Sequence, residues 1–323
     1  MKIRFLRLLG CTAFCLALVF VMGAGDAANT PQYTKDGKLV RPDYRQWTYL
    51  SSGLGMNYGP GAAGVSAAPA FTNVFVNPES YREFQKTGKW PDKTMFALEI
   101  YASSTHSSPN RNGFFQDTPM GLEFNVKDSS FPEGWRFFNF DGESREGTAI
   151  PKEASCLTCH SKNAAVENSF GQFYPTVLKV ALAKGTVKPG VHIALSGFRF
   201  AELIEKKGWP EAERAYYEEK KSEDFALTEP VLNATGYHLL GMDDAKTAIQ
   251  IFELVTREHP DSANAWDSLA DGYAAANRNS DAIAATQKEL ALLPNAKGIP
   301  DMQKERIAKS AKERLAKLQD AKK

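Results

Sequence analysis

The chain has 323 residues and a net charge of +1 at pH 7, with 39 Lys and Arg against 38 Asp and Glu. This balance argues against nucleic acid as the main partner, because phosphate binding requires a marked excess of positive charge. The length allows two ordinary domains, and a hydrophobic fraction of 43% is sufficient to build their cores.

The N-terminus has the pattern of a secretory signal peptide. Three basic residues precede a nearly continuous apolar run over residues 8–22, and the small residues that follow suit cleavage after Ala27 or Ala28. The run is too short to be a persuasive membrane-spanning helix. We therefore predict a signal peptide over residues 1–27, export to the periplasm, and no membrane span after cleavage.

Alternating apolar and polar residues predict a series of strands in the first half of the chain. A stretch rich in Gly, Ala, Pro and Ser precedes them over residues 51–70 and is predicted to be a loop. The close spacing of the strands, followed by a loop with two cysteines and a helix after Asn163, predicts an α+β domain over residues 31–185. The predicted strands cover residues 71–77, 94–102, 121–126 and 135–140, with a short helix over residues 79–87.

The functional prediction depends on two cysteines and a histidine. Cys156 and Cys159 are separated by two residues and His160 follows at once, which is the spacing of a c-type haem attachment site. In such a site the two thiols bind the haem vinyl groups, and the imidazole becomes an axial iron ligand. A disulfide or half of a zinc site is the alternative. The other two of the four cysteines lie in the predicted signal peptide and cannot compete, so we predict one covalent haem c.

The sequence around these residues resembles the cytochrome P460 family. The resemblance covers about residues 38–180, and several motifs occur in the same order. It implies a mainly antiparallel β-sheet domain that carries one c-type haem, with a five-coordinate iron and an open distal face, the fold shared with cytochrome c′-beta. The similar segments are residues 71–81, 86–92, 156–160, 162–164 and 173–175, together with Phe170.

One residue departs from the family pattern. P460 cytochromes that oxidise hydroxylamine cross-link a lysine to the haem, and the resemblance places that lysine directly before a glutamate. Here the glutamate is Glu99 and the preceding residue is Leu98, so we expect no cross-link. The chain is therefore more similar to cytochrome c′-beta, in which apolar side chains cap the distal pocket and small gases bind.

We expect Phe96 and Leu98 to line the distal side of the haem. Phe124 and Phe138 are further candidates, although ordinary core packing is the favoured explanation for both. Glu99 is a candidate distal proton carrier, but strand alternation places it on the face opposite Leu98.

A sixth protein ligand would make the chain a plain electron carrier. The candidates are His106 in a polar loop, and Met95 and Met120 in the strand region. Solvent exposure is the simpler explanation for a lone loop histidine, so we expect an open iron face.

The second half of the chain is predicted to be helical and repetitive. A Gly-Tyr pair at position 236 recurs at position 272, and helices that open on Ala212, Ala248 and Ala282 are spaced by 36 and 34 residues. This spacing is typical of tetratricopeptide repeats. We predict a linker over residues 186–196 and a repeat domain over residues 197–323, which ends in a capping helix and docks a protein partner.

Together these features predict a periplasmic mono-haem c-type cytochrome with a five-coordinate, histidine-ligated iron. Its expected activity is the binding of a small gaseous or nitrogenous ligand such as NO, or electron transfer. The alternative is an enzyme of the P460 type that oxidises hydroxylamine or NO, or that reacts with peroxide. Leu98 favours the first class, because it cannot form the cross-link.

Overall fold

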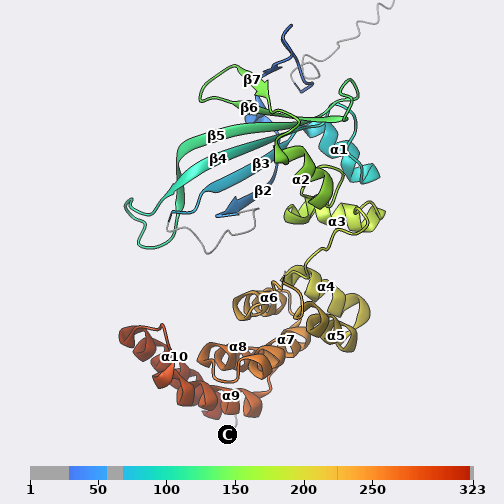
Figure 1. Ribbon diagram of the computed structural model, residues 1–323. Coiled ribbons are helices and arrows are strands. Elements are labelled where there is room, and N and C mark those ends of the chain that lie inside the picture. The colour runs from blue at the N-terminus through green and yellow to red at the C-terminus, as the bar shows by residue number, and fades with distance from the viewer. Residues whose placement is uncertain (1–28, 57–67, 224, 321–323) are drawn as a thin grey trace, which may run out of the picture. The chain divides into compact units, whose positions relative to one another are not determined.

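The computed structural model describes residues 29–56, 68–223 and 225–320. The chain divides into two compact units, Met1–His192 and Ile193–Lys323, and this division lies inside the predicted linker. The predicted α+β class is confirmed, because an antiparallel sheet dominates the first unit and the described part of the second is helical (Figure 1). The predicted signal peptide lies outside the described residues. No described helix is long and apolar enough to cross a membrane.

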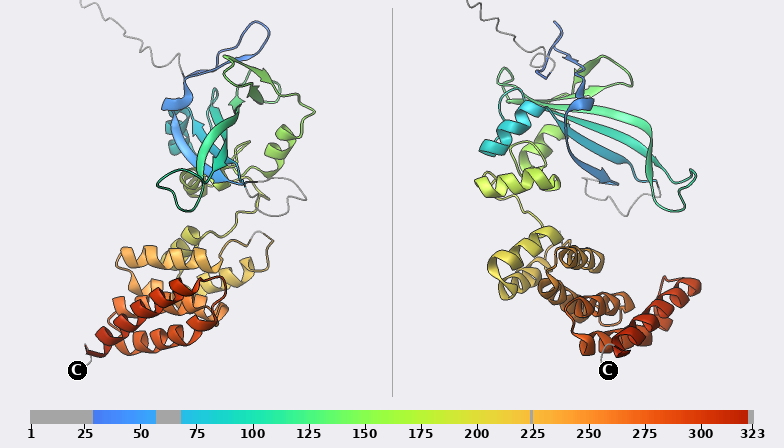
Figure 2. Two further views of the ribbon diagram at one scale, coloured as in Figure 1. Left: turned by 90° about the vertical axis from the view of Figure 1, so that its left-hand side faces the viewer. Right: turned by 180° about the vertical axis from the view of Figure 1, so that it is seen from behind.

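The first unit is built on an antiparallel sheet, which has seven strands among the described residues. The strands are β1 (Leu39–Val40), β2 (Thr48–Leu54), β3 (Phe71–Val76), β4 (Met95–Ser104), β5 (Phe115–Lys127), β6 (Trp135–Phe140) and β7 (Glu146–Ala149). They are arranged in the order β1-β7-β6-β5-β4-β3-β2. Helices α1 (Pro78–Thr87), α2 (Ser155–Asn163) and α3 (Pro175–Lys184) lie to one side of the sheet (Figures 1 and 2). The described part of this unit also contains two 3-10 helices, η1 (Tyr44–Gln46) and η2 (Gly171–Phe173).

Two segments differ from their predicted structure. Strand β2 enters the stretch 51–70, because its backbone pairs with β3 from Thr48 to Leu54 and this edge pairing needs no large side chains. The cysteine motif lies within helix α2 and not in a loop, and the helix ends at Asn163 instead of beginning after it. None of the side chains of α2 is fully buried, so the segment lacks the apolar period by which a sequence reveals a helix.

The two faces of the sheet have different partners. On one face, Met95 and Ala97 of β4 pack in a core that the N-terminal residues Tyr44 and Trp47 complete. On the other face, the Phe96 ring meets Trp90 edge-on at 4.8 Å, and Trp90 stacks at 4.0 Å on Phe84 of α1. Residues 96 and 98 therefore point to the side of the sheet on which the helices lie.

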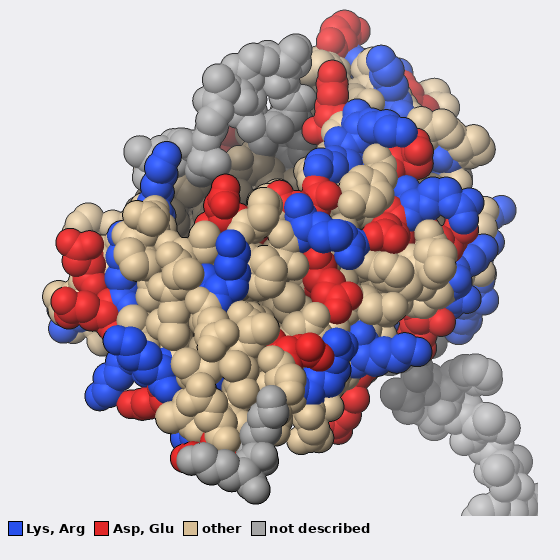
Figure 3. Space-filling view, turned by 90° about the horizontal axis from the view of Figure 1, so that it is seen from below, with Lys and Arg blue, Asp and Glu red and all other residues tan. Residues whose placement is uncertain are grey.

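The described part of the second unit consists of helices, most of which pack against the next helix in the chain (Figure 2). They are α4 (Gly197–Lys207), α5 (Trp209–Glu219), α6 (Glu229–Gly241), α7 (Ala245–Glu258), α8 (Ala263–Ala275), α9 (Asn279–Leu292) and α10 (Asp301–Asp320), with the 3-10 helix η3 (Leu293–Asn295). Basic and acidic side chains are interspersed on the face that Figure 3 shows. The helical region is compatible with a repeat domain.

The recurring glycines have a packing role. Gly236 of α6 and Gly272 of α8 contact opposite edges of the Phe252 ring of α7, and a Cβ atom at either position would overlap that ring. The recurrence in the sequence therefore reflects close approach of successive helices to one phenylalanine. The recurring alanines of α5, α7 and α9 are fully buried: Ala212, Ala248 and Ala282.

Arg314 of α10 joins three helices through carboxylates. Its guanidinium lies 2.8 Å from Asp267 and 2.6 Å from Asp271 of α8, and 2.5 Å from Glu289 of α9. Glu289 is only 1% exposed, and this burial, followed by the nearby Asp267 carboxylate, raises the pKa of Glu289 to about 7. The folded unit thus holds a proton at a pH at which the unfolded chain has released it.

The stability of the helical unit should therefore decrease as the pH rises. An unfolded glutamate has a pKa near 4.5, so the free energy of unfolding should fall between about pH 4.5 and pH 7, by up to about 3 kcal/mol. Glu289→Gln should remove most of this dependence, measured by urea denaturation of the helical circular dichroism at pH 5 and pH 8. The exposed Glu305→Gln variant is the control, and equal pH dependence in both variants would contradict the assignment to Glu289.

Candidate haem site

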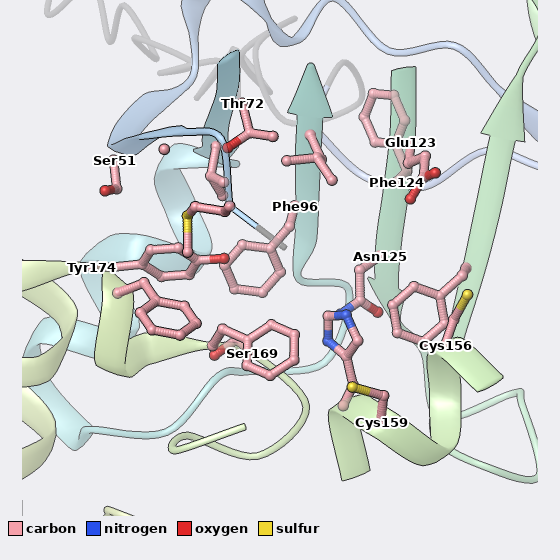
Figure 4. Close-up of a pocket in the computed structure, with 18 of the residues that line it drawn as sticks. Ser51, Thr72, Phe96, Glu123, Phe124, Asn125, Cys156, Cys159, Ser169 and Tyr174 are labelled. Carbon is pink, nitrogen blue, oxygen red and sulfur yellow. The ribbon is translucent and has the colours of Figure 1, made fainter. Parts of the chain in front are cut away.

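A cavity of about 340 Å³ lies between helix α2 and the sheet. Figure 4 shows Phe96, Glu123 and Asn125 on neighbouring strands at one side, with Cys156 and Cys159 on the helix at the other. The site therefore combines a wall of strand residues with a wall of helix residues. The lining includes, from the strands, Thr72, Val74, Phe96, Leu98, Glu123, Asn125 and Phe137 and, from α2, Cys156, Cys159 and His160.

The helix wall carries the three predicted haem ligands. Cys156, Cys159 and His160 share one face of α2, because residues three and four apart in a helix lie above one another. Both thiols are free, and both line the cavity together with the imidazole. Attachment of haem c requires two thiols and one imidazole beside such a cavity, so the residues present fit this group. Among the described residues, no group of three or more His, Cys, Asp and Glu is arranged to hold a bare metal ion.

A backbone carbonyl sets the orientation of the imidazole of His160. Its Nδ1 atom lies 2.7 Å from the carbonyl oxygen of Asn168. Since a carbonyl only accepts, Nδ1 carries the proton, and Nε2 keeps the lone pair that a metal requires. The ring packs against Phe137 and Phe170 at centroid distances of 4.7 and 4.3 Å. Burial lowers the pKa of His160 and so favours the neutral form, which is the ligating one.

The Asn168 carbonyl belongs to a tight turn that other side chains hold in place. Val166 and Ser169 exchange backbone hydrogen bonds across this turn, and Glu167 has a left-handed backbone with φ of 50°. The Glu167 carboxylate accepts from Lys127 Nζ at 2.6 Å and from the backbone N–H of Trp90 at 3.1 Å. The indole N–H of Trp90 donates to Ser169 Oγ at 2.9 Å. The turn is therefore fixed from both sides of Asn168.

The strand wall contains the predicted distal residues Phe96 and Leu98. Antiparallel pairing sets Leu98 of β4 beside Val74 of β3 and Glu123 of β5. Leu98 thus occupies the position at which the resemblance places the cross-linking lysine, in the middle of this wall. The thioether side chain of Met56, beyond the end of β2, also borders the cavity.

Glu123 lines the cavity, although no local sequence pattern predicts this. Its carboxyl group is partly buried, and burial raises its pKa. The sequence places Glu123 in a predicted strand, but only the register Leu98↔Glu123 brings it to the cavity. The same holds for Asn125, because its pairing with Phe96 determines its face.

Glu99 does not line the cavity. The alternation of β4 turns it to the opposite face, where it is 3% exposed and accepts hydrogen bonds from Tyr44 at 2.7 Å and from Asn73 at 3.2 Å. Arg45 forms an ion pair with it at 2.9 Å. Burial, followed by the hydrogen bond to Glu99, raises the pKa of Tyr44 to about 12. Glu99 therefore anchors the N-terminal segment to the sheet, and a role as distal proton carrier is not supported.

Of the other predicted site residues, Phe124 borders the cavity and the rest do not line it. Phe124 borders it but packs, like Phe138, in the core of the opposite face. The predicted alternatives for a sixth ligand do not line the cavity: Met95 is buried in the same core, Met120 is 65% exposed, and His106 contacts Thr105 in the loop between β4 and β5.

One comparison with known proteins, the match to a family model, agrees with this site. The family description cytochrome P460 matches residues 41–170, which include the strand wall and all three predicted ligands. No curated protein sequence matches the chain. Among solved structures, MamA 41-end from Desulfovibrio magneticus RS-1 is 16% identical, with 45% of this chain and 84% of that chain covered, and a TM-score of 0.24. A MamA RS-1 ArsTM double mutant is 18% identical, with 45% and 83% covered, and has the same TM-score.

The similarity to these MamA structures is too low to bear on fold or function. The family match coincides with the unit that contains the cavity, and it supports a haem cytochrome. Residues 41–170 of this chain are therefore similar to the cytochrome P460 family.

Proposed function

We propose that this chain is an exported, periplasmic c-type cytochrome with one haem, attached through Cys156 and Cys159 and ligated by His160. The haem held by these residues would bind a small ligand of the NO type or transfer electrons. The observation that carries this proposal is that two free thiols and an oriented imidazole line the same cavity as Phe96 and Leu98.

In this proposal the residues of the helix wall and those of the strand wall have different roles. His160 supplies Nε2 on the helix side, and the bond to Asn168 holds its ring. Val74, Phe96 and Leu98 exclude water on the strand side, which favours small uncharged ligands. When bound, haem supplies an iron that binds such ligands or changes its oxidation state.

Covalent attachment is expected to require both thiols. The double variant Cys156→Ser, Cys159→Ser should lose all haem that resists acidified organic solvent, while Ser155→Ala should keep it. Intact mass of the purified protein and haem staining after denaturing electrophoresis measure this. A wild-type mass without haem would contradict the proposal. A low-spin, six-coordinate optical and electron paramagnetic resonance spectrum would contradict the open face.

One observation favours the second candidate, an enzyme that oxidises hydroxylamine or NO. Glu123 places a carboxyl group in an otherwise largely apolar wall, and the pKa of that group is raised by burial. A carboxylate in this position can accept a proton from a bound N–H or O–H group. The alternative therefore has a candidate general base in Glu123, whereas Glu99 faces away.

The two glutamates give a matched test of this candidate. If the chain is an enzyme, Glu123→Gln should lower turnover of hydroxylamine on the order of 100-fold, because it removes the base. The wild-type rate should increase with pH through the raised pKa of Glu123, since the base acts in its ionised form. Glu99→Gln should reduce stability without this loss of rate. Equal turnover in the wild type and in Glu123→Gln would exclude Glu123 as the base.

We also propose that the helical unit is a tetratricopeptide-like domain that docks a protein partner. Two observations support this proposal: helices pack closely around Phe252, and the regularly spaced alanines are fully buried. A chain that ends at His192 should keep its haem spectrum but lose at least one protein that co-purifies with the full chain from the periplasm. Identical partner profiles for the two chains would contradict the docking role.

A further inference from the structure

Asn125 of β5 and His160 of α2 donate hydrogen bonds to the same backbone oxygen. His160 Nδ1 lies 2.7 Å from the carbonyl oxygen of Asn168, and Asn125 Nδ2 lies 3.2 Å from it. Asn125 lines the cavity and is only 9% exposed. A residue of the strand wall and the proposed iron ligand of the helix wall therefore share one acceptor.

This contact fixes the orientation of the Asn125 amide. A carbonyl oxygen cannot donate, so the amide NH2 group must face Asn168 and the amide oxygen must point elsewhere. That oxygen, Oδ1, is buried and has no hydrogen-bond partner among the described residues. Since buried acceptors are normally satisfied, an unpaired one beside a cavity indicates that a donor binds there.

The shared acceptor cannot easily move toward either donor. Glu167, held by Lys127 and by the backbone N–H of Trp90, fixes the turn before Asn168, and Ser169 fixes it afterwards through the Trp90 indole. If one donor is removed, the carbonyl oxygen therefore stays in place and becomes fully available to the other.

The strength of the His160 hydrogen bond matters for the opposite nitrogen of the ring. A stronger bond at Nδ1 gives the imidazole more anionic character, and Nε2 then donates more strongly to a metal. A second donor on the same oxygen draws on the same electron density and weakens the first bond. Asn125 thus opposes the effect of Asn168 on His160.

We propose that Asn125 is a positioning residue that tunes the His160 imidazole through the shared Asn168 carbonyl. Its Oδ1 accepts a hydrogen bond from a ligand or water in the cavity, which polarises the amide and strengthens its bond to Asn168. Occupancy of the cavity is in this way linked to electron donation by the histidine. The inference rests on the proposed ligation of haem by His160.

The test compares the haem-loaded full chain with its Asn125→Leu variant. Removal of the amide donor should raise the iron–histidine stretching frequency in the resonance Raman spectrum of the ferrous protein. It should also lower the midpoint potential, because stronger donation by the imidazole stabilises the ferric state. Asn125→Gln, which keeps an amide donor, should shift both quantities less. Asn139→Leu changes an exposed asparagine of β6 outside the cavity and should shift neither.

The outcomes separate the inference from the proposed function. Wild-type protein without covalent haem would refute the proposed function before any variant is compared. A haem-loaded Asn125→Leu variant with unchanged stretching frequency and potential would overturn the tuning role alone. If leucine prevents loading, Asn125→Ala removes the same donor without added volume and should give the same shifts. Loss of loading in both variants would overturn tuning in favour of a purely structural role.

Discussion

The geometry of the site depends on the hydrogen bond from His160 Nδ1 to the Asn168 carbonyl. A histidine on a partly exposed helix could otherwise rotate its ring and present either nitrogen. The carbonyl selects one tautomer and one orientation, and this leaves Nε2 as the nitrogen with a free lone pair. The left-handed backbone at Glu167 costs about 1–2 kcal/mol, and the contacts of its carboxylate with Lys127 and Trp90 offset that cost.

Trp90 links the two walls of the cavity. Its backbone and indole N–H groups hold the turn that positions His160, while its ring lies between Phe84 of α1 and Phe96 of β4. The helix wall and the strand wall therefore depend on one buried side chain.

The sequence was sufficient to predict the fold class and to select three residues that line the cavity, but not to predict the strand register. The spacing of Cys156, Cys159 and His160 is a local pattern, and strand alternation is also local, so both could be predicted. The pairing of β4 with β5 is a long-range property, and it decides that Glu123 reaches the cavity. The sequence of helix α2 shows no apolar helical period, because none of its side chains is fully buried. The turn at Asn168 likewise acts through its backbone, which no side-chain pattern reveals.

Glu99 and Glu123 show how strand register assigns different chemistry to similar residues. Glu99 is buried but fully paired, so it contributes to the attachment of the N-terminal segment. Burial of Glu123 raises the pKa of its carboxyl group. In its neutral form the carboxyl group preserves a largely uncharged cavity beside Leu98, which suits a small gas. In its ionised form it is a base within the same wall. The same carboxyl group is thus compatible with either proposed function, according to its protonation state.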